Sequence, residues 1–257
     1  MNYDIRIGDY KIKTLDSVNI VKSVENLTDK ATIVIPGTHI NRSLEVEDML
    51  KEGDVVAISL GYDNDLKTEF TGYLSGISTD DSTIKLICED ALYLFKKSLK
   101  DREIKSIRLK KLLSDIIDEI NTINKTNGTI TNYKLDCDFD FGYSKFVLYK
   151  ATGLDALQKI QEETKANIYF EGETLHVHAV YSYIVNEQAV VFDFAKNIEK
   201  SDLKYMRAKD KKIEVEVKIV KPDGKITSEK FGNPGGIKTT RTVSAESASD
   251  LKKIAEN

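Results

Sequence analysis

Two histidines separated by one residue have the type and spacing that could bind a metal ion. His176 and His178 fall in a segment predicted as a β-strand, where residues two apart point to the same face. Imidazole nitrogen is a common ligand of transition metals. The third histidine, His39, falls in a distant predicted loop, and spacing reveals no third ligand. We therefore expect a polar strand face here and no metal site.

Three aspartates alternate with other residues earlier in the chain. Asp136, Asp138 and Asp140 resemble the start of a calcium-binding EF-hand loop. That loop needs Gly at its sixth position and Glu at its twelfth, where this chain has Phe141 and Val147. The strict alternation favours a solvated strand face, and a charged interface stays open as an alternative.

No motif for a catalytic nucleophile or a nucleotide phosphate is present. The sequence lacks GxGxxG, Walker, GxSxG, HExxH and paired-cysteine patterns. Cys88 and Cys137 each lie in an apolar stretch, as expected of small buried side chains in a reducing compartment. Two carboxylates can form the catalytic pair of a glycosidase, but 42 acidic residues make such a pair unidentifiable by spacing. We expect no catalytic residue, no cofactor and no small-molecule substrate.

One segment carries a local excess of positive charge. Between Lys96 and Lys111 the chain has eight basic residues and only two acidic ones, Asp101 and Glu103. Such a segment could dock on an acidic partner or a phosphate. A solvated helix surface with its linker is the commoner explanation, and we expect that arrangement.

Length and charge limit the classes of function. A chain of 257 residues is long enough for one or two domains with a real core. The formal net charge of −4 disfavours binding to a nucleic-acid backbone. The sequence begins without the basic and apolar segments of a signal peptide, and no apolar run approaches the length of a membrane helix. We expect a folded protein without nucleic-acid or membrane partners.

The first part of the chain, residues 1–98, predicts a small β-barrel. About seven short segments alternate between apolar and polar residues, with turn residues such as Gly8 between them. A short helix is predicted over 44–50. Gly72 and Gly76 have the GxxxG spacing, but inside a strand they indicate a bend or a close approach of two backbones.

Residues 99–196 predict a middle α+β domain. Apolar residues at helical spacing predict a helix over 109–120, with Ser106 as its cap and Asn127–Gly128 as its end. The strict alternation over 133–141 predicts one strand. Thr152 and Asp155 form a predicted capping box for the next helix, and a hairpin follows over 167–180.

Residues 197–257 predict an incomplete second β-barrel that ends in a helix. Alternating segments over 213–219 and 226–231 flank a turn at 222–224, and another strand is predicted over 237–243. An amphipathic helix begins near Ser247. A few strands leave this region short of a self-sufficient barrel, so we expect that the natural protein continues beyond Asn257.

The order of seven segments along the chain is more informative than any single motif. In that order they resemble the baseplate hub proteins of phage tails, a family also called late control D, whose relatives form the base of type VI secretion spikes. The segments are residues 24–36, 52–62, 70–77, 88–95, 154–160, 167–170 and 174–177.

The resemblance implies a non-enzymatic structural protein of the virion, made in the bacterial host. It implies a homotrimeric ring with two barrel-like domains in each subunit, joining the tail tube to the central spike of a contractile or related tail. No lysozyme-like insert is evident, so the cell-wall cleavage of some relatives is not transferred. The alternative is a ligand-binding barrel module for oligonucleotides or glycans. A carboxylate-dependent cell-wall hydrolase is a third alternative.

Overall fold

The computed structural model describes residues 2–37, 49–63, 65–80, 82–179, 191–198, 200, 212–220 and 225–243 of the 257-residue chain. Within these residues most strand pairings are antiparallel and helices are few, which confirms the predicted α+β class dominated by antiparallel strands. No helix in the described part is both long and apolar enough to cross a membrane. Residues 44–48 of one predicted helix, the turn 222–224 and the helix over 247–257 lie outside the described residues.

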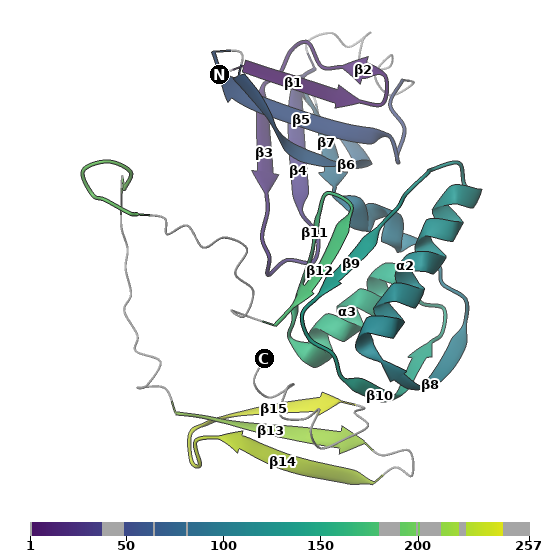
Figure 1. The fold of residues 1–257 in the computed structure, drawn as a ribbon. Helices are drawn as coiled ribbons and strands as arrows, with labels where there is room; N and C mark the ends of the chain where they lie inside the picture. Colours follow the sequence, from purple (N-terminus) through teal and green to yellow (C-terminus); the bar gives the residue numbers. More distant parts are fainter. Residues whose placement is uncertain are drawn as a thin grey trace.

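The N-terminal strands form one antiparallel sheet with the order β2-β1-β5-β6-β7-β4-β3 (Figure 1). No pairing between described strands joins the edges β2 and β3, so hydrogen bonds do not close the sheet into the predicted barrel. The strands are β1 (Asn2–Ile7), β2 (Tyr10–Lys11), β3 (Ser17–Val21), β4 (Lys30–Pro36), β5 (Val55–Tyr62), β6 (Asp65–Thr79) and β7 (Thr83–Glu89).

Alternating apolar residues build this sheet, because every second side chain of a strand points to the same face. In β4, Ala31, Ile33 and Ile35 are buried, and residues of β1, β5, β6 and β7 join them in one core. Gly8 has a φ of 55° at the predicted turn between β1 and β2, a conformation that glycine adopts without steric cost. Figure 1 shows β1 and β5 running across β3 and β4, so the sheet curls around its own core.

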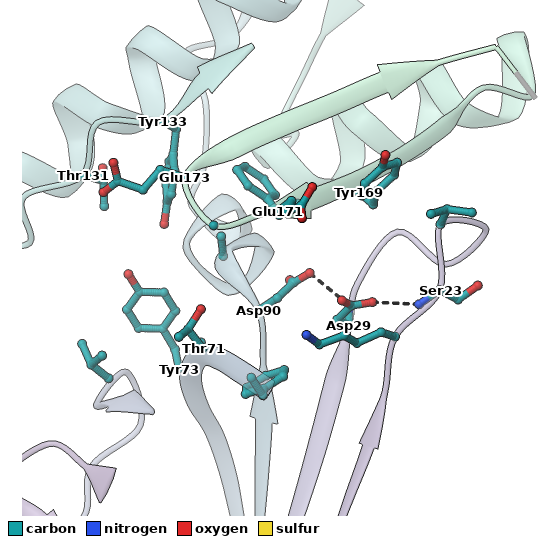
Figure 2. A pocket seen from close by; sticks show the side chains of 18 of the residues that line it. Ser23, Asp29, Thr71, Tyr73, Asp90, Thr131, Tyr133, Tyr169, Glu171 and Glu173 are labelled. Atoms are coloured by element: carbon teal, nitrogen blue, oxygen red, sulfur yellow. Dashed lines mark hydrogen bonds between the residues drawn. The ribbon is translucent and has the colours of Figure 1, made fainter. Parts of the chain in front are cut away.

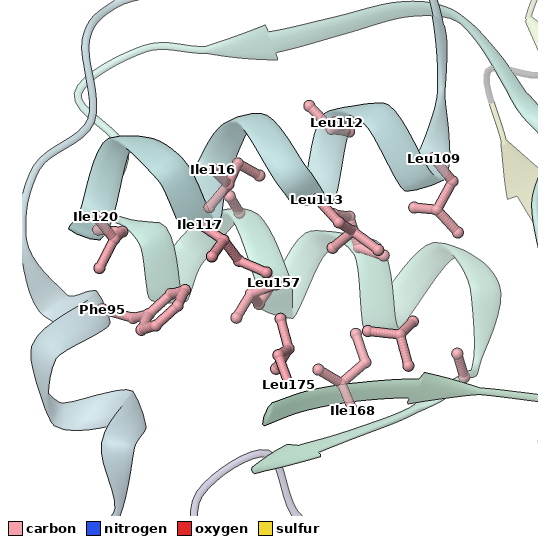
Figure 3. Close-up of a cluster of buried hydrophobic side chains, with 14 of the residues drawn as sticks. Phe95, Leu109, Leu112, Leu113, Ile116, Ile117, Ile120, Leu157, Ile168 and Leu175 are labelled. Atoms are coloured by element: carbon pink, nitrogen blue, oxygen red, sulfur yellow. The ribbon is translucent and has the colours of Figure 1, made fainter. Parts of the chain in front are cut away.

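The middle of the chain places two helices on one face of a small sheet. The apolar side of α2 (Leu109–Thr126) and that of α3 (Gly153–Thr164) meet the sheet β11-β12-β9, where Leu157 and Leu175 lie in one buried cluster (Figure 3). The remaining elements are the 3-10 helix η1 (Ala91–Lys96) and the strands β8 (Arg102–Arg108), β9 (Lys134–Cys137), β10 (Gly142–Leu148), β11 (Asn167–Glu171) and β12 (Thr174–His178).

The ends of the two helices test the capping predictions. Thr152 and Asp155 form the predicted capping box of α3. The predicted end of α2 is also confirmed, because its C-terminal cap is Asn127. The predicted Ser106 cap is wrong, since Ser106 lies within β8. Asp140 replaces it, because its Oδ1 accepts a hydrogen bond from the Lys110 backbone N–H in the first turn of α2 at 3.0 Å.

The single strand predicted over 133–141 is wrong in its second half. The strand β9 ends at Cys137, and the next strand, β10, begins at Gly142. Between them the chain turns so that the Phe141 ring is fully buried and packs at a tilt against the Tyr143 ring, with 4.8 Å between centroids. Burying two aromatic rings is worth more than continuing one wet strand, so tertiary packing overrides the local alternation.

The described C-terminal residues form a third sheet with the order β14-β13-β15, which contains β13 (Ile213–Val220), β14 (Ile226–Gly232) and β15 (Ile237–Val243). β13 and β14 pair antiparallel, which confirms the predicted hairpin strands, and β15 pairs parallel with β13. Val217 of β13 is buried and belongs to the same hydrophobic cluster as Leu157 of α3.

Candidate functional site

A cleft of about 620 Å³ lies between the N-terminal sheet and the β11–β12 hairpin (Figure 2). The turn between β3 and β4, strands β5 and β6 and the start of η1 supply one wall, and the segment before β9 together with the tip of the hairpin supplies the other. Carboxylates and tyrosine rings dominate the polar part of its lining. They are Asp29, Asp90, Glu171 and Glu173, and Tyr73, Tyr133 and Tyr169.

Asp90 is the most deeply buried carboxyl of the cleft, with 6% of its surface exposed. It precedes η1, and its Oδ1 accepts a hydrogen bond from the Leu92 N–H at 3.0 Å. Its Oδ2 accepts another from the Asp29 backbone N–H at 3.0 Å. Burial raises the Asp90 pKa to about 7, although both backbone donors favour the charged form and oppose the shift.

The neighbouring Asp29 has a similar use. Its Oδ1 accepts a hydrogen bond from the Ser23 N–H at 3.0 Å, and burial raises its pKa. Carboxyls with raised pKa values in a cleft are typical of acid–base catalysts. Here both of them accept backbone N–H groups and hold the β3–β4 turn against η1, which is a structural use. An acidic lining attracts cationic groups and repels phosphate.

Aromatic rings fill the junction behind the cleft. Tyr133 lies 5.6 Å from Phe95 of η1 and 5.1 Å from Phe170 of β11, measured between ring centroids. Tyr73 of β6 stacks on Tyr93 of η1 at 5.7 Å. Burial raises the pKa of the Tyr133 phenol, which keeps it protonated at neutral pH. These contacts connect the N-terminal sheet to the layer of helices.

On the face of β12 opposite the helices, three polar side chains meet. Leu175 and Val177 are buried in the helix-covered core, so His176 and His178 point to the other face, as predicted. His176 Nδ1 lies 3.0 Å from Asp136 Oδ2 and 3.3 Å from His178 Nε2. Asp136 is therefore the third ligand that residue spacing did not reveal, and the three groups could together hold a metal ion.

Strand pairing explains how Asp136 reaches the histidines. β9 pairs parallel with β12, and the register places Asp136 beside His176. On the other side of β12 the Tyr169 ring of β11 stacks on the His176 ring, with centroids 5.0 Å apart and planes 13° apart. Residue spacing alone contains no signal for a pairing between segments 40 positions apart, so the sequence analysis missed this cluster.

The other two aspartates of the alternating segment also have partners, although all three carboxylates keep part of the predicted exposure to solvent. Asp138 Oδ2 lies 3.4 Å from His178 Nδ1, and its Oδ1 accepts a hydrogen bond from the Ala179 N–H at 3.3 Å. Asp140 Oδ2 accepts a hydrogen bond from Arg108 Nε at 3.0 Å.

The basic segment begins at the end of η1 and reaches the first turn of α2 at Lys110 and Lys111, as a helix surface would, but its centre is a strand and not only a linker. Its centre forms β8, which pairs with β10. Five of its eight basic side chains lie beside carboxylates, which reduces the local positive charge that a docking patch would need. The pairs are Lys96–Glu89, Arg102–Glu119, Lys105–Glu103, Arg108–Asp140 and Lys111–Asp115.

The remaining predicted positions have packing roles or lie outside the described residues. A Cβ added to Gly72 would stand 2.1 Å from the Glu89 carbonyl oxygen, which confirms the predicted close approach of backbones. The register of β6 shifts between Leu74 and Gly76, which confirms the bend. Cys88 is fully buried, and burial raises its thiol pKa to about 12. His39 lies outside the described residues.

Comparison with known proteins places the fold. No family model matches the chain, and no curated protein matches it either. Among solved structures, a tail protein from Neisseria meningitidis MC58 matches 98% of this chain and 74% of its own, at 15% identity and a TM-score of 0.60. The chain has the fold of phage tail proteins. The resemblance predicted from the seven segments is thereby confirmed at the level of fold.

Two further tail proteins share this fold over the same extent. The 43 kDa tail protein of prophage MuSo2 from Shewanella oneidensis matches 98% of this chain and 76% of its own, at 13% identity and a TM-score of 0.59. The prophage tail protein gp18 from Listeria monocytogenes EGD-e matches the same shares at 10% identity and a TM-score of 0.57. The tail-protein fold therefore includes nearly the whole chain and not one common sheet alone.

Proposed function

We propose that this protein is a non-enzymatic structural component of a phage or phage-like tail. The observation that carries the proposal is the likeness to the Neisseria tail protein over 98% of the chain. The use of Asp29 and Asp90 as acceptors for backbone N–H groups supports a structural use of the cleft. A protein of this kind works through the surfaces that it offers to other subunits.

The finer part of the proposal is a baseplate hub, a homotrimeric ring in the virion that joins the tail tube to the central spike. Unpaired strand edges favour association, because they can continue a sheet into a neighbouring subunit. Among the described strands, such edges occur at β2 and β3 and at β14 and β15. The segment around Phe192 and Phe194 adds exposed apolar surface that suits a protein contact.

We also propose the division of the chain at residues 1–98, 99–196 and 197–257. Two separate hydrophobic clusters support a division near the first boundary, because one ends at Cys88 and the other begins at Ala91; η1, which precedes residue 98, packs in the second cluster. The second boundary separates the hydrophobic cores less completely, since Val217 packs into the cluster of the middle part.

Mass in solution tests the ring. We expect light scattering on the untagged protein, at tens of micromolar, to give three times the 29.0 kDa of one chain. If the phenylalanine segment lies in the interface, the double variant Phe192→Asp/Phe194→Asp dissociates while the control Ile130→Asp, another exposed apolar residue, does not. A monomeric mass, together with no binding to tail tube or spike proteins, would contradict the proposed hub.

The cleft favours one alternative, a module that binds glycans. Tyrosine rings beside carboxylates can stack on sugars and accept their hydroxyl hydrogen bonds, whereas the acidic lining is unfavourable for oligonucleotides. Saturable, specific binding on a glycan array would support this module, and its loss in Tyr169→Ala would place the ligand in the cleft. Clearing of peptidoglycan in a zymogram would contradict the non-enzymatic role.

A further inference from the structure

We propose that Asp136, His176 and His178 form a binding site for one divalent transition-metal ion of the zinc type. The site lies on the face of the sheet β11-β12-β9 that the helices leave uncovered. It goes beyond a structural role in a tail, because nothing in that role requires a metal.

The geometry of the donor atoms carries the proposal. Asp136 Oδ2, His176 Nδ1 and His178 Nε2 form a triangle with sides of 3.0, 3.3 and 3.4 Å. Bonds of about 2.0 to 2.1 Å to a tetrahedral zinc ion separate neighbouring ligand atoms by about 3.3 Å. The triangle therefore has the size of one face of a zinc coordination tetrahedron, without any movement of the backbone.

The identity of the donors narrows the class of ion. Two imidazole nitrogens and one carboxylate oxygen suit zinc and its neighbours in the transition series, whereas calcium and magnesium prefer oxygen donors alone. A fourth position stays open on the side of Asp136, whose side chain is 41% exposed while those of the histidines are 10% and 2% exposed. Water can reach the ion from that side and complete its coordination.

Groups around the three ligands fix their orientation. Asp138 Oδ2 lies 3.4 Å from His178 Nδ1, the ring nitrogen that faces away from the proposed ion. Glu171 Oε2 lies 3.8 Å from His176 Nε2 in the same way. Carboxylates behind ligating histidines are typical of protein zinc sites, because they hold the tautomer and the ring orientation. The stacked Tyr169 ring further restricts rotation of His176.

The ion would connect two strands that are far apart in sequence. Asp136 belongs to β9 and both histidines belong to β12, which pair in parallel through four residues of each strand. The three ligands come together only when β9 and β12 pair, so an ion that binds the folded protein and not the unfolded chain stabilises the folded state.

The test uses the full chain made without a polyhistidine tag, stripped with chelator and dialysed against zinc. We expect one zinc ion per chain by elemental analysis. The variants His176→Gln, His178→Gln and Asp136→Asn should each lose that ion, while the control His39→Gln keeps it. Asp138→Asn should keep the stoichiometry and weaken the affinity about 10-fold or more, because it removes only a group behind a ligand.

Cobalt binding to the unaltered protein provides a measurement that needs no variant to fold. Equimolar Co²⁺ should give the strong visible absorption of a four-coordinate site, and equimolar Zn²⁺ should abolish it. Two results overturn the proposal: a cobalt spectrum identical to that of the ion in water, or zinc binding that is unchanged in folded His176→Gln and His178→Gln proteins.

Discussion

Raising the pH from about 5 to about 8 should weaken the fold through Asp90. Burial raises the pKa of this carboxyl from 3.8 to about 7, so the folded protein keeps a proton that the unfolded chain has already released. Unfolding therefore releases a proton in this window, and stability falls as the pH rises. Asp80 behaves differently, because hydrogen bonds from backbone and side-chain groups lower its pKa to about 2. It stays ionised between pH 5 and pH 8, so it does not change the stability over this range.

The size of the effect follows from the same shift. One pKa unit corresponds to about 1.4 kcal/mol, and a carboxyl shifted by roughly three units loses about 2 to 3 kcal/mol of stability between pH 5 and pH 8. Solvent screening hardly reduces this energy, because Asp90 is almost fully buried. Asp29, with a pKa also raised by burial, contributes in the same direction.

Urea unfolding followed by far-UV circular dichroism measures the effect, since the chain has no tryptophan. The matched variant Asp90→Asn keeps an oxygen for the Leu92 N–H and cannot ionise. Between pH 5 and pH 8 the unaltered protein should therefore lose about 2 to 3 kcal/mol more stability than the variant. Parallel pH profiles for the two proteins would refute the reasoning. A profile in which the unaltered protein gains stability with pH relative to the variant would reverse its sign.

Three further predictions concern packing and capping. Leu157→Ala should cost about 2 to 5 kcal/mol in urea unfolding, because Leu157 is fully buried between the helices and the sheet, and a cost under 1 kcal/mol would show that the site collapses. Thr152→Ala should cost about 1 kcal/mol by removing the capping box, and Thr152→Ser should restore most of it. Gly72→Ala should lower the melting temperature because its Cβ meets the Glu89 carbonyl, whereas Gly76→Ala, with open space around it, should not, and equal effects would contradict the close approach.

Local sequence patterns predicted which helices and strands form better than they predicted where these elements begin and end. The alternation in β4 and the capping box at Thr152 depend on neighbours within a few residues, and both are confirmed. The limits fail where a distant group intervenes. Asp140 caps α2 in place of Ser106, and burial of Phe141 ends the strand that alternation would have continued.

The candidate sites depend on pairings that the sequence does not encode locally. The residue spacing identified His176 and His178 as a pair on one face, which the structure confirms. Asp136 joins them only because β9 pairs parallel with β12. A parallel pair is not connected by a tight turn, so no turn residues in the sequence indicate the pairing. The cleft likewise brings Asp90 and Glu171, about 80 residues apart, into one lining, which residue spacing cannot predict.

The position of β12 in the chain affects how the protein emerges from the ribosome. The apolar face of α2 is complete at Thr126, but the sheet β11-β12-β9 on which it packs is complete only at His178, about 50 residues later (Figure 3). At roughly 5 to 20 residues per second, that face waits several seconds for its sheet. During that interval the apolar face of α2 is exposed to chaperones and to wrong partners.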